Sequence, residues 1–133
     1  MSFFRKPEAI RIAIIDDNSE MLRCLRYALT KLARALKILK PDILPLMDPT
    51  WVEKHYKDHP FPDVILCDYM MPEMNGYDVY IKLKEMGYKG QFIFVTGAED
   101  KLMSEHEDLD YEETKIISKP YDIKDFKEVL AHG

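Results

Sequence analysis

The 133-residue chain has no long apolar run and no excess of positive charge. A helix that crosses a membrane needs about 20 mostly apolar residues in succession, and no stretch of this chain approaches that length. The formal net charge is -5, which argues against direct binding to nucleic acid or to an anionic membrane surface. Residues 1–7 also lack the apolar core of a secretion signal.

Cysteine is scarce as well. The two cysteines, Cys24 and Cys67, have no spacing typical of a metal site. Cys67 lies inside an apolar run, which favours a buried free thiol over a redox or ligand role. These features predict a cytoplasmic, reducing compartment. The length suits one compact domain, and the chain has no internal repeat or low-complexity linker, so a single domain over residues 1–133 is expected.

Five short apolar runs occupy residues 10–15, 43–47, 64–67, 92–95 and 116–117. Several are continuous rather than alternating, which is typical of strands that are covered on both faces in a parallel sheet. The segments between them have helical periodicity, clearest where leucines recur from Leu22 to Leu36. Alternating strands and helices predict right-handed crossovers and a single doubly wound α/β sheet with five parallel strands and five helices.

Several helix boundaries can be predicted. Asn18 or Ser19 is expected to cap the first helix. Apolar residues also occur after Leu36, which suggests that this helix continues through Leu39. Gly87 is expected to end the third helix. Residues 99–113 are acidic and only weakly periodic, which predicts a short helix followed by a loop.

Polar residues follow four of the apolar runs. Asp16 and Asp17 end the first run, Asp68 the third, Thr96 the fourth and Lys119 the fifth. Ligands of open parallel sheets bind outside the carboxyl ends of the strands. We therefore expect these side chains to form one site.

Converging carboxylates repel each other, and a divalent cation removes that repulsion. Carboxylate and carbonyl oxygens favour Mg²⁺. An aspartate can act as a nucleophile and form an aspartyl-phosphate, a reaction in which positioning and charge stabilisation carry most of the catalysis. The residue set therefore predicts a Mg²⁺-assisted phosphorylation site, where Lys119 supplies a second positive charge and Thr96 a hydroxyl donor.

Four motifs together resemble the receiver domain of two-component response regulators, the chemotaxis-protein-like family. They are residues 14–18 (IIDDN), 63–76 (DVILCDYMMPEMNG), 94–97 (FVTG) and 117–120 (ISKP). The resemblance covers about residues 9–130. It implies a flavodoxin-like fold with strand order 2-1-3-4-5, the order known for the chemotaxis protein.

The resemblance also implies a role for each matched acidic residue. Asp68 would be the phosphoacceptor. Mg²⁺ would be bound by Asp17, Asp68 and the backbone carbonyl of Met70, while Asp16 would act mainly through a bound water.

For the remaining positions the resemblance implies phosphoryl contacts and a switch. Thr96 and Lys119 would contact the phosphoryl group, and the bond from Lys119 to Pro120 would be cis. Gly76 would need either a positive φ or close backbone packing. Many family members carry an aromatic residue three positions before the lysine, where it moves together with the threonine. That position is Ile116 here, so the switch positions are Thr96 and a non-aromatic Ile116.

The expected function is that of a phosphoacceptor domain rather than an enzyme, since it would assist only its own phosphorylation and dephosphorylation. Its expected partners are a histidine kinase or phosphotransfer protein and a downstream partner or output domain, with a phosphorylation-linked homodimer as a further possibility. The chain could be a stand-alone receiver or a piece of a longer regulator or hybrid histidine kinase.

Two other functions stay open at this point. A Mg²⁺-dependent phosphatase that forms an aspartyl-phosphate typically carries Asp-x-Asp, whereas Asp68 is followed by Tyr69 and Met70. A flavin-binding flavodoxin-like module would need a phosphate-cradling loop after the first strand. There, Asp16 and Asp17 would repel a phosphate unless a metal were bound.

Overall fold

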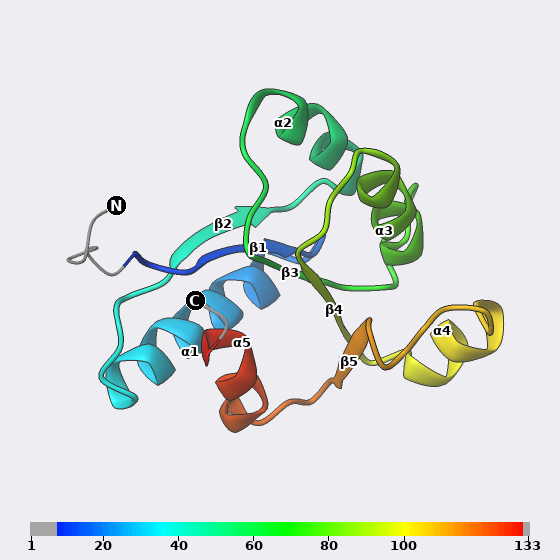
Figure 1. The fold of residues 1–133 in the computed structure, drawn as a ribbon. Helices are drawn as coiled ribbons and strands as arrows, with labels where there is room; N and C mark the ends of the chain where they lie inside the picture. The colour runs from blue at the N-terminus through cyan, green and yellow to red at the C-terminus, as the bar shows by residue number, and fades with distance from the viewer. Residues whose placement is uncertain (1–7, 132–133) are drawn as a thin grey trace.

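The computed structural model describes residues 8–131 as a five-stranded parallel sheet with helices on both faces (Figure 1). The sheet order is β2-β1-β3-β4-β5, which confirms the predicted flavodoxin-like α/β fold. The strands are β1 (Arg11–Ile15), β2 (Asp42–Leu46), β3 (Val64–Cys67), β4 (Gln91–Thr96) and β5 (Lys115–Ser118). Residues 1–7, which bear on the expected lack of a secretion signal, lie outside the described residues.

The helices form two layers. In Figure 1, α1 and α5 lie on one face of the sheet, and α2 and α3 lie on the other. The helices are α1 (Ser19–Ala35), α2 (Val52–Asp58) after the 3-10 turn η1 (Pro49–Trp51), α3 (Gly76–Glu85), α4 (Glu99–Glu105), and α5 (Lys127–Ala131) after the 3-10 turn η2 (Ile123–Phe126). None of the helices in the described part of the chain is long and apolar enough to cross a membrane.

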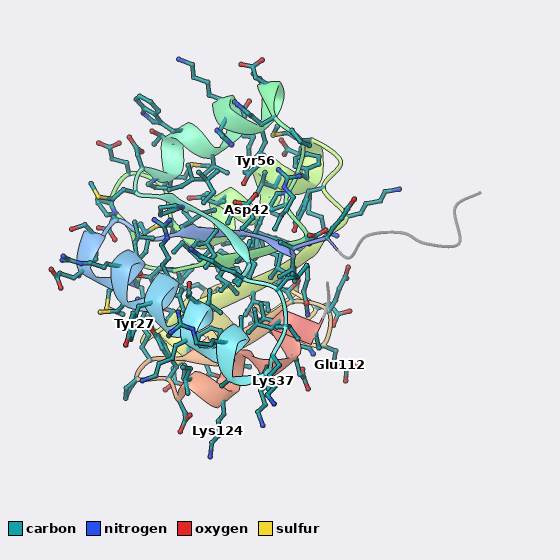
Figure 2. The ribbon with its side chains drawn as sticks, turned by 90° about the vertical axis from the view of Figure 1, so that its left-hand side faces the viewer. Tyr27, Lys37, Asp42, Tyr56, Glu112 and Lys124 are labelled. Carbon is teal, nitrogen blue, oxygen red and sulfur yellow. The ribbon has the colours of Figure 1, made fainter. Side chains whose placement is uncertain are left out.

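The continuous apolar runs are explained by two separate cores. Ile12 and Ile14 of β1 pack in the core beneath α1 and α5, whereas Ala13 and Ile15 pack in the core beneath α2, α3 and α4. Successive side chains of a strand point to opposite faces, so a central strand needs apolar residues at every position. Figure 2 shows the two layers on either side of the sheet, with Tyr27 of α1 in one and Tyr56 of α2 in the other.

The prediction that the first helix continues through Leu39 is wrong. α1 ends at Ala35, and Lys37 has a φ of 57°. The amide of Lys37 donates to the carbonyl of Arg34 and the amide of Ile38 to the carbonyl of Ala33, which is the hydrogen-bond pattern of a Schellman motif. The carbonyls of Ala33 and Arg34 are thereby satisfied, and helical periodicity alone did not reveal this stop.

The other predicted boundaries are confirmed. The Asn18 side chain accepts hydrogen bonds from the amides of Glu20 and Met21 and so caps α1. Gly87 follows the C-cap of α3 with a φ of 93°, a conformation that favours glycine. α4 is the short helix predicted within residues 99–113.

Candidate functional site

The polar residues predicted at the strand ends lie together at the carboxyl edge of the sheet. β1 and β3 are neighbours, and the amide of Asp68 donates to the carbonyl of Ile15 at 2.9 Å. β4 and β5 are also neighbours, and the amide of Lys119 donates to the carbonyl of Thr96 at 2.9 Å. Because β3 pairs with β4, these four strand ends form one continuous edge.

Three carboxylates form an acidic cluster at this edge. Asp16, Asp17 and Asp68 each place a carboxylate oxygen within 4.8 Å of the others. Asp16 is buried, Asp68 is partly buried and Asp17 is exposed, so the cluster is reached from solvent on one side. A hard cation such as Mg²⁺ takes oxygen ligands and keeps several of its waters. The donor set and its one-sided exposure therefore fit the metal that the sequence predicts.

Lys119 supplies the positive charge beside this cluster. Its Nζ lies 3.0 Å from Oδ2 of Asp16 and 3.5 Å from Oδ2 of Asp68. Burial lowers the pKa of Lys119, but the hydrogen bond to Asp16 and the charges of both carboxylates outweigh it, so the net shift is upward. The ammonium group is therefore charged at neutral pH and joins the ends of β1, β3 and β5.

The pKa of Asp68 is raised. Burial is the largest cause, and the nearby charge of Asp16 adds to it. The charge of Lys119 and the hydrogen bonds from the Thr96 hydroxyl and the Tyr69 amide oppose this rise, and the Tyr69 amide lies 2.8 Å from Oδ1 of Asp68. Ionised Asp68 is thus held under electrostatic strain that a bound cation would relieve.

The remaining predicted residues occupy distinct places around the acidic cluster. Thr96 is 1% exposed, and its Oγ1 accepts a hydrogen bond from the amide of Ala98 at 3.1 Å. Gly76 is required by close packing rather than by its φ, because an added Cβ would lie 2.2 Å from the carbonyl oxygen of Asp68. The bond from Lys119 to Pro120 is cis, as predicted.

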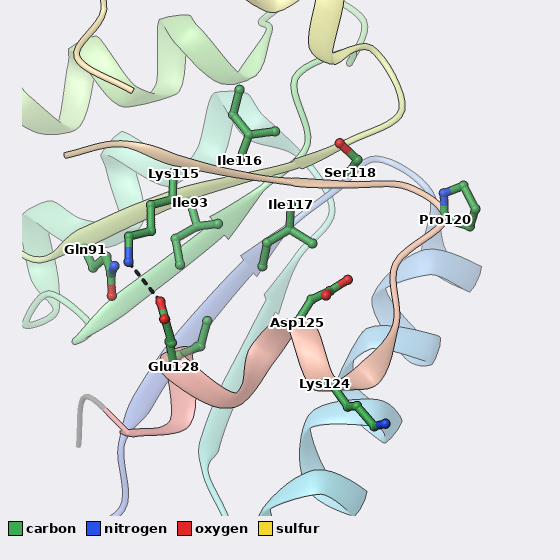
Figure 3. Close-up of a pocket in the computed structure, with 11 residues that line it drawn as sticks. Gln91, Ile93, Lys115, Ile116, Ile117, Ser118, Pro120, Lys124, Asp125 and Glu128 are labelled. Carbon is green, nitrogen blue, oxygen red and sulfur yellow. Dashed lines mark hydrogen bonds and ion pairs between the residues drawn. The ribbon is translucent and has the colours of Figure 1, made fainter. Parts of the chain in front are cut away.

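Ile116 lies on β5 and faces the α4 side of the sheet. Figure 3 shows its side chain pointing away from that of Ile117. Ile116 packs against the core beneath α2, α3 and α4, and Ile117 packs against the core beneath α1 and α5. A separate groove lies between β5 and α5, where Lys115 Nζ pairs with Oε2 of Glu128 at 2.9 Å (Figure 3).

Cys67 is a buried free thiol, as the sequence predicts. Its Sγ donates to the carbonyl oxygen of Asp68 at 3.2 Å. Burial raises the pKa of Cys67 well above its usual value, and the charge of Asp68 raises it further. The thiol is therefore protonated and unreactive at neutral pH, and it contributes to packing beside the site.

The contact between the site and α4 was not predicted from the sequence. The hydroxyl of Tyr69 donates to the carboxylate of Glu105 and lies 3.0 Å from Nε2 of His106. The only sequence signal for this contact is an aromatic residue directly after Asp68, and that signal alone does not identify a partner 36 residues further along the chain.

A family match agrees with this geometry. A family model described as the response regulator receiver domain matches residues 12–131. This chain belongs to the response regulator receiver domain family. Receiver domains are signalling domains of two-component systems, and the acidic cluster of this receiver domain lies within the matched residues.

Solved structures share the fold of this receiver domain at low sequence identity. A two-component transcriptional regulator AraC from Clostridium phytofermentans ISDg is 24% identical with a TM-score of 0.74, over 92% of this chain and 90% of that chain. A response regulator receiver domain protein from Clostridium thermocellum is 21% identical with a TM-score of 0.70, over 92% and 91%. An adenylate cyclase from Rhodopirellula baltica is 22% identical with a TM-score of 0.72, over 93% and 86%. No curated protein sequence matches the chain significantly.

Replacing Lys119 by methionine should weaken the metal-free receiver domain and strengthen its binding of Mg²⁺. Loss of the ammonium leaves Asp16 and Asp68 without their cation, so the free energy of unfolding should fall by roughly 1–3 kcal/mol. Removing a positive charge beside the acidic cluster should increase Mg²⁺ affinity by about fivefold, equal to about 1 kcal/mol. Urea denaturation and calorimetric Mg²⁺ titration measure the two effects.

Lys115→Met is the matched control, because Lys115 pairs with Glu128 in a solvent-exposed ion pair on the same strand. That variant should change the free energy of unfolding by less than about 1 kcal/mol and leave Mg²⁺ affinity unchanged. Weaker Mg²⁺ binding by Lys119→Met would contradict the electrostatic role assigned to Lys119.

Proposed function

We propose that the chain is a phosphoacceptor receiver domain that is phosphorylated on Asp68 with the help of Mg²⁺. The observation that carries this proposal is the position of Asp68. At the carboxyl edge of a parallel sheet, its carboxylate lies 3.5 Å from the Lys119 ammonium and within 4.8 Å of the carboxylates of Asp16 and Asp17. A structural ion pair would need only one carboxylate, whereas this arrangement leaves an excess of negative charge that suits a divalent cation.

The proposed donor is a phosphohistidine of a histidine kinase or of a phosphotransfer protein. A carboxylate oxygen of Asp68 forms a bond to phosphorus as the P–N bond to the histidine breaks, and the electron pair of that bond returns to the imidazole nitrogen. Bound Mg²⁺ would neutralise charge on the phosphoryl oxygens. Asp17, Asp68 and the backbone carbonyl of Met70 would hold it, with Asp16 acting through a bound water.

Lys119 and Thr96 are the proposed contacts of the phosphoryl group. Lys119 is already charged and directed at Asp68, so it can stabilise the incoming negative charge without reorganisation. The Thr96 hydroxyl would donate to a phosphoryl oxygen and leave its present environment beside the amide of Ala98. Thr96 and Ile116 are then the proposed switch positions.

The two neighbours named a transcriptional regulator and an adenylate cyclase suggest how such a domain is used. We propose that residues 1–133 form one receiver domain that acts in the cytoplasm on a downstream protein partner or output domain. A homodimer formed on phosphorylation is one such assembly. The phosphatase reading lacks a specific observation in its favour, since the position two residues after Asp68 is Met70.

Acetyl phosphate with Mg²⁺ tests the proposal without knowledge of the kinase. We expect the intact mass to rise by one phosphoryl group, the rise to need Mg²⁺, and borohydride trapping followed by peptide mapping to place the group on Asp68. No mass gain at saturating donor and Mg²⁺, or a group on another residue, would refute the assignment. Multiple turnover of phosphomonoesters would favour a hydrolase instead.

A further inference from the structure

The segment directly after Asp68 is connected to the end of α4 by the side chain of Tyr69. We propose that Tyr69 is a positioning residue that transmits the change at Asp68 to the C-terminal end of α4. This inference rests on the proposed phosphorylation of Asp68, and it assigns the route by which that event alters the surface.

One end of the connection lies in the phosphorylation site. The amide of Tyr69 donates to Oδ1 of Asp68 at 2.8 Å, and the carbonyl of Tyr69 accepts from the amide of Gly76 at 2.8 Å. The ring of Tyr69 is only 2% exposed and packs edge-on against Phe94 of β4 with ring centroids 6.4 Å apart. A change in what Oδ1 binds therefore acts directly on the backbone of Tyr69.

The other end lies at the end of α4. Glu105 is the last residue of α4 and His106 is its C-cap, and the Tyr69 hydroxyl contacts both side chains. The imidazole of His106 is in turn stacked on the ring of Tyr77 in α3, with centroids 3.6 Å apart. The Tyr69 hydroxyl thus meets a defined set of partners rather than solvent.

α4 depends for its stability on contacts with the rest of the domain. It has seven residues, and its N-cap, Ala98, offers no side-chain hydrogen bond. Helices this short are marginal without tertiary contacts. The amide of Ala98 is bonded to Oγ1 of Thr96, so both ends of α4 are tied to residues of the site, one through Thr96 and the other through Tyr69.

A phosphoryl group on Asp68 would act on both connections to α4, the one through Thr96 and the one through Tyr69. It adds negative charge and strong acceptor oxygens beside the Tyr69 amide and the Thr96 hydroxyl. The Tyr69 ring has few rotatable bonds and lies in a close-packed core, where small shifts are transmitted rather than absorbed. An aliphatic Ile116 has no ring to exchange between solvent and core, so Tyr69 supplies the aromatic link at the other side of β4.

Hydrogen exchange of α4 with and without beryllofluoride and Mg²⁺ tests this route, because beryllofluoride stands in for the phosphoryl group on an aspartate. In the wild-type chain we expect the exchange rates of the amides in residues 102–106 to change by about fivefold or more, as is typical of coupled sites. In Tyr69→Phe this beryllofluoride-induced change should be lost. Fluorine NMR measures bound beryllofluoride, so the variants are compared at equal occupancy.

Tyr111→Phe is the matched control. The Tyr111 hydroxyl donates to the carbonyls of His106 and Leu102, so this variant removes a hydroxyl bond from the same end of α4 without a link to Asp68. It should shift exchange equally with and without beryllofluoride and so retain the induced change. The inference would be overturned if Tyr69→Phe kept the induced change in exchange of the wild type, or if Tyr111→Phe lost it to the same extent as Tyr69→Phe. It would also be overturned if the wild-type chain bound beryllofluoride without any change in exchange at α4. Absence of bound beryllofluoride in the wild-type chain would instead overturn the proposed function on which it rests.

Discussion

Replacing Asp68 by asparagine is expected to abolish uptake of the phosphoryl group and, at the same time, to stabilise the metal-free protein. Asparagine has nearly the same shape but no nucleophilic carboxylate, so the mass gain from acetyl phosphate should disappear completely. Its amide also carries no charge, and the site then holds two carboxylates beside Lys119 instead of three. Because the Asp68 side chain is 12% exposed, the lost repulsion is only partly screened by solvent.

The stabilisation should depend on pH in a defined direction. Burial and Asp16 raise the pKa of Asp68 above its usual value of 3.8, so the folded state binds the proton more tightly than the unfolded state does. The wild-type chain therefore loses stability as the pH rises from about 3.8 through the folded-state pKa. Asp68→Asn lacks this loss. The variant should therefore be no more stable than the wild type in acid, and its extra stability should reach its full value above the folded-state pKa of Asp68.

Thermal and urea denaturation with and without Mg²⁺ measure this difference. Without Mg²⁺, Asp68→Asn should melt a few degrees above the wild type at neutral pH. With Mg²⁺ the difference in melting temperature should become smaller or change sign, since only the intact acidic cluster gains stability from the cation. Asp42→Asn, an exposed position at the start of β2, is the control and should show neither effect. If metal-free Asp68→Asn were less stable than the metal-free wild type, repulsion among the three carboxylates would not destabilise the domain.

Replacing Gly76 by alanine should be strongly destabilising. The added Cβ would lie 2.2 Å from the carbonyl oxygen of Asp68 and 3.0 Å from Cα of Tyr69. Both are backbone atoms, so no side-chain rotation can relieve the overlap, and the loop that follows β3 must move. We expect the free energy of unfolding to fall by roughly 3 kcal/mol. Urea denaturation measures the loss of stability.

The same displacement should slow phosphorylation, because the loop carries Asp68 and the proposed carbonyl ligand of Met70. Gly97→Ala is the matched control at the same edge of the sheet. Its Cβ would come no closer than 3.9 Å to Cβ of Lys119, an ordinary contact, so stability should change by less than about 0.5 kcal/mol. Equal behaviour of the two variants would refute the packing explanation for Gly76.

Sequence patterns predicted most of the fold because the relevant forces are local in sequence. The predicted strand at residues 64–67 coincides with β3, since a strand covered on both faces must be apolar at every position. Turn and cap residues such as Asn18 and Gly87 marked helix ends through their own backbone preferences. The end of α1 was missed because Lys37 adopts a positive φ without being glycine.

The sequence by itself determined the α/β class, the positions of the strands and the identity of the polar residues at their ends. Only the tertiary structure decided how those residues meet. Lys119 and Asp16 are 103 positions apart in the chain, and they pair because β1 and β5 end at the same edge of one sheet. The contact of Tyr69 with Glu105 depends in the same way on where α4 packs. Such contacts are set by the packing of whole elements, which local preferences constrain but do not specify.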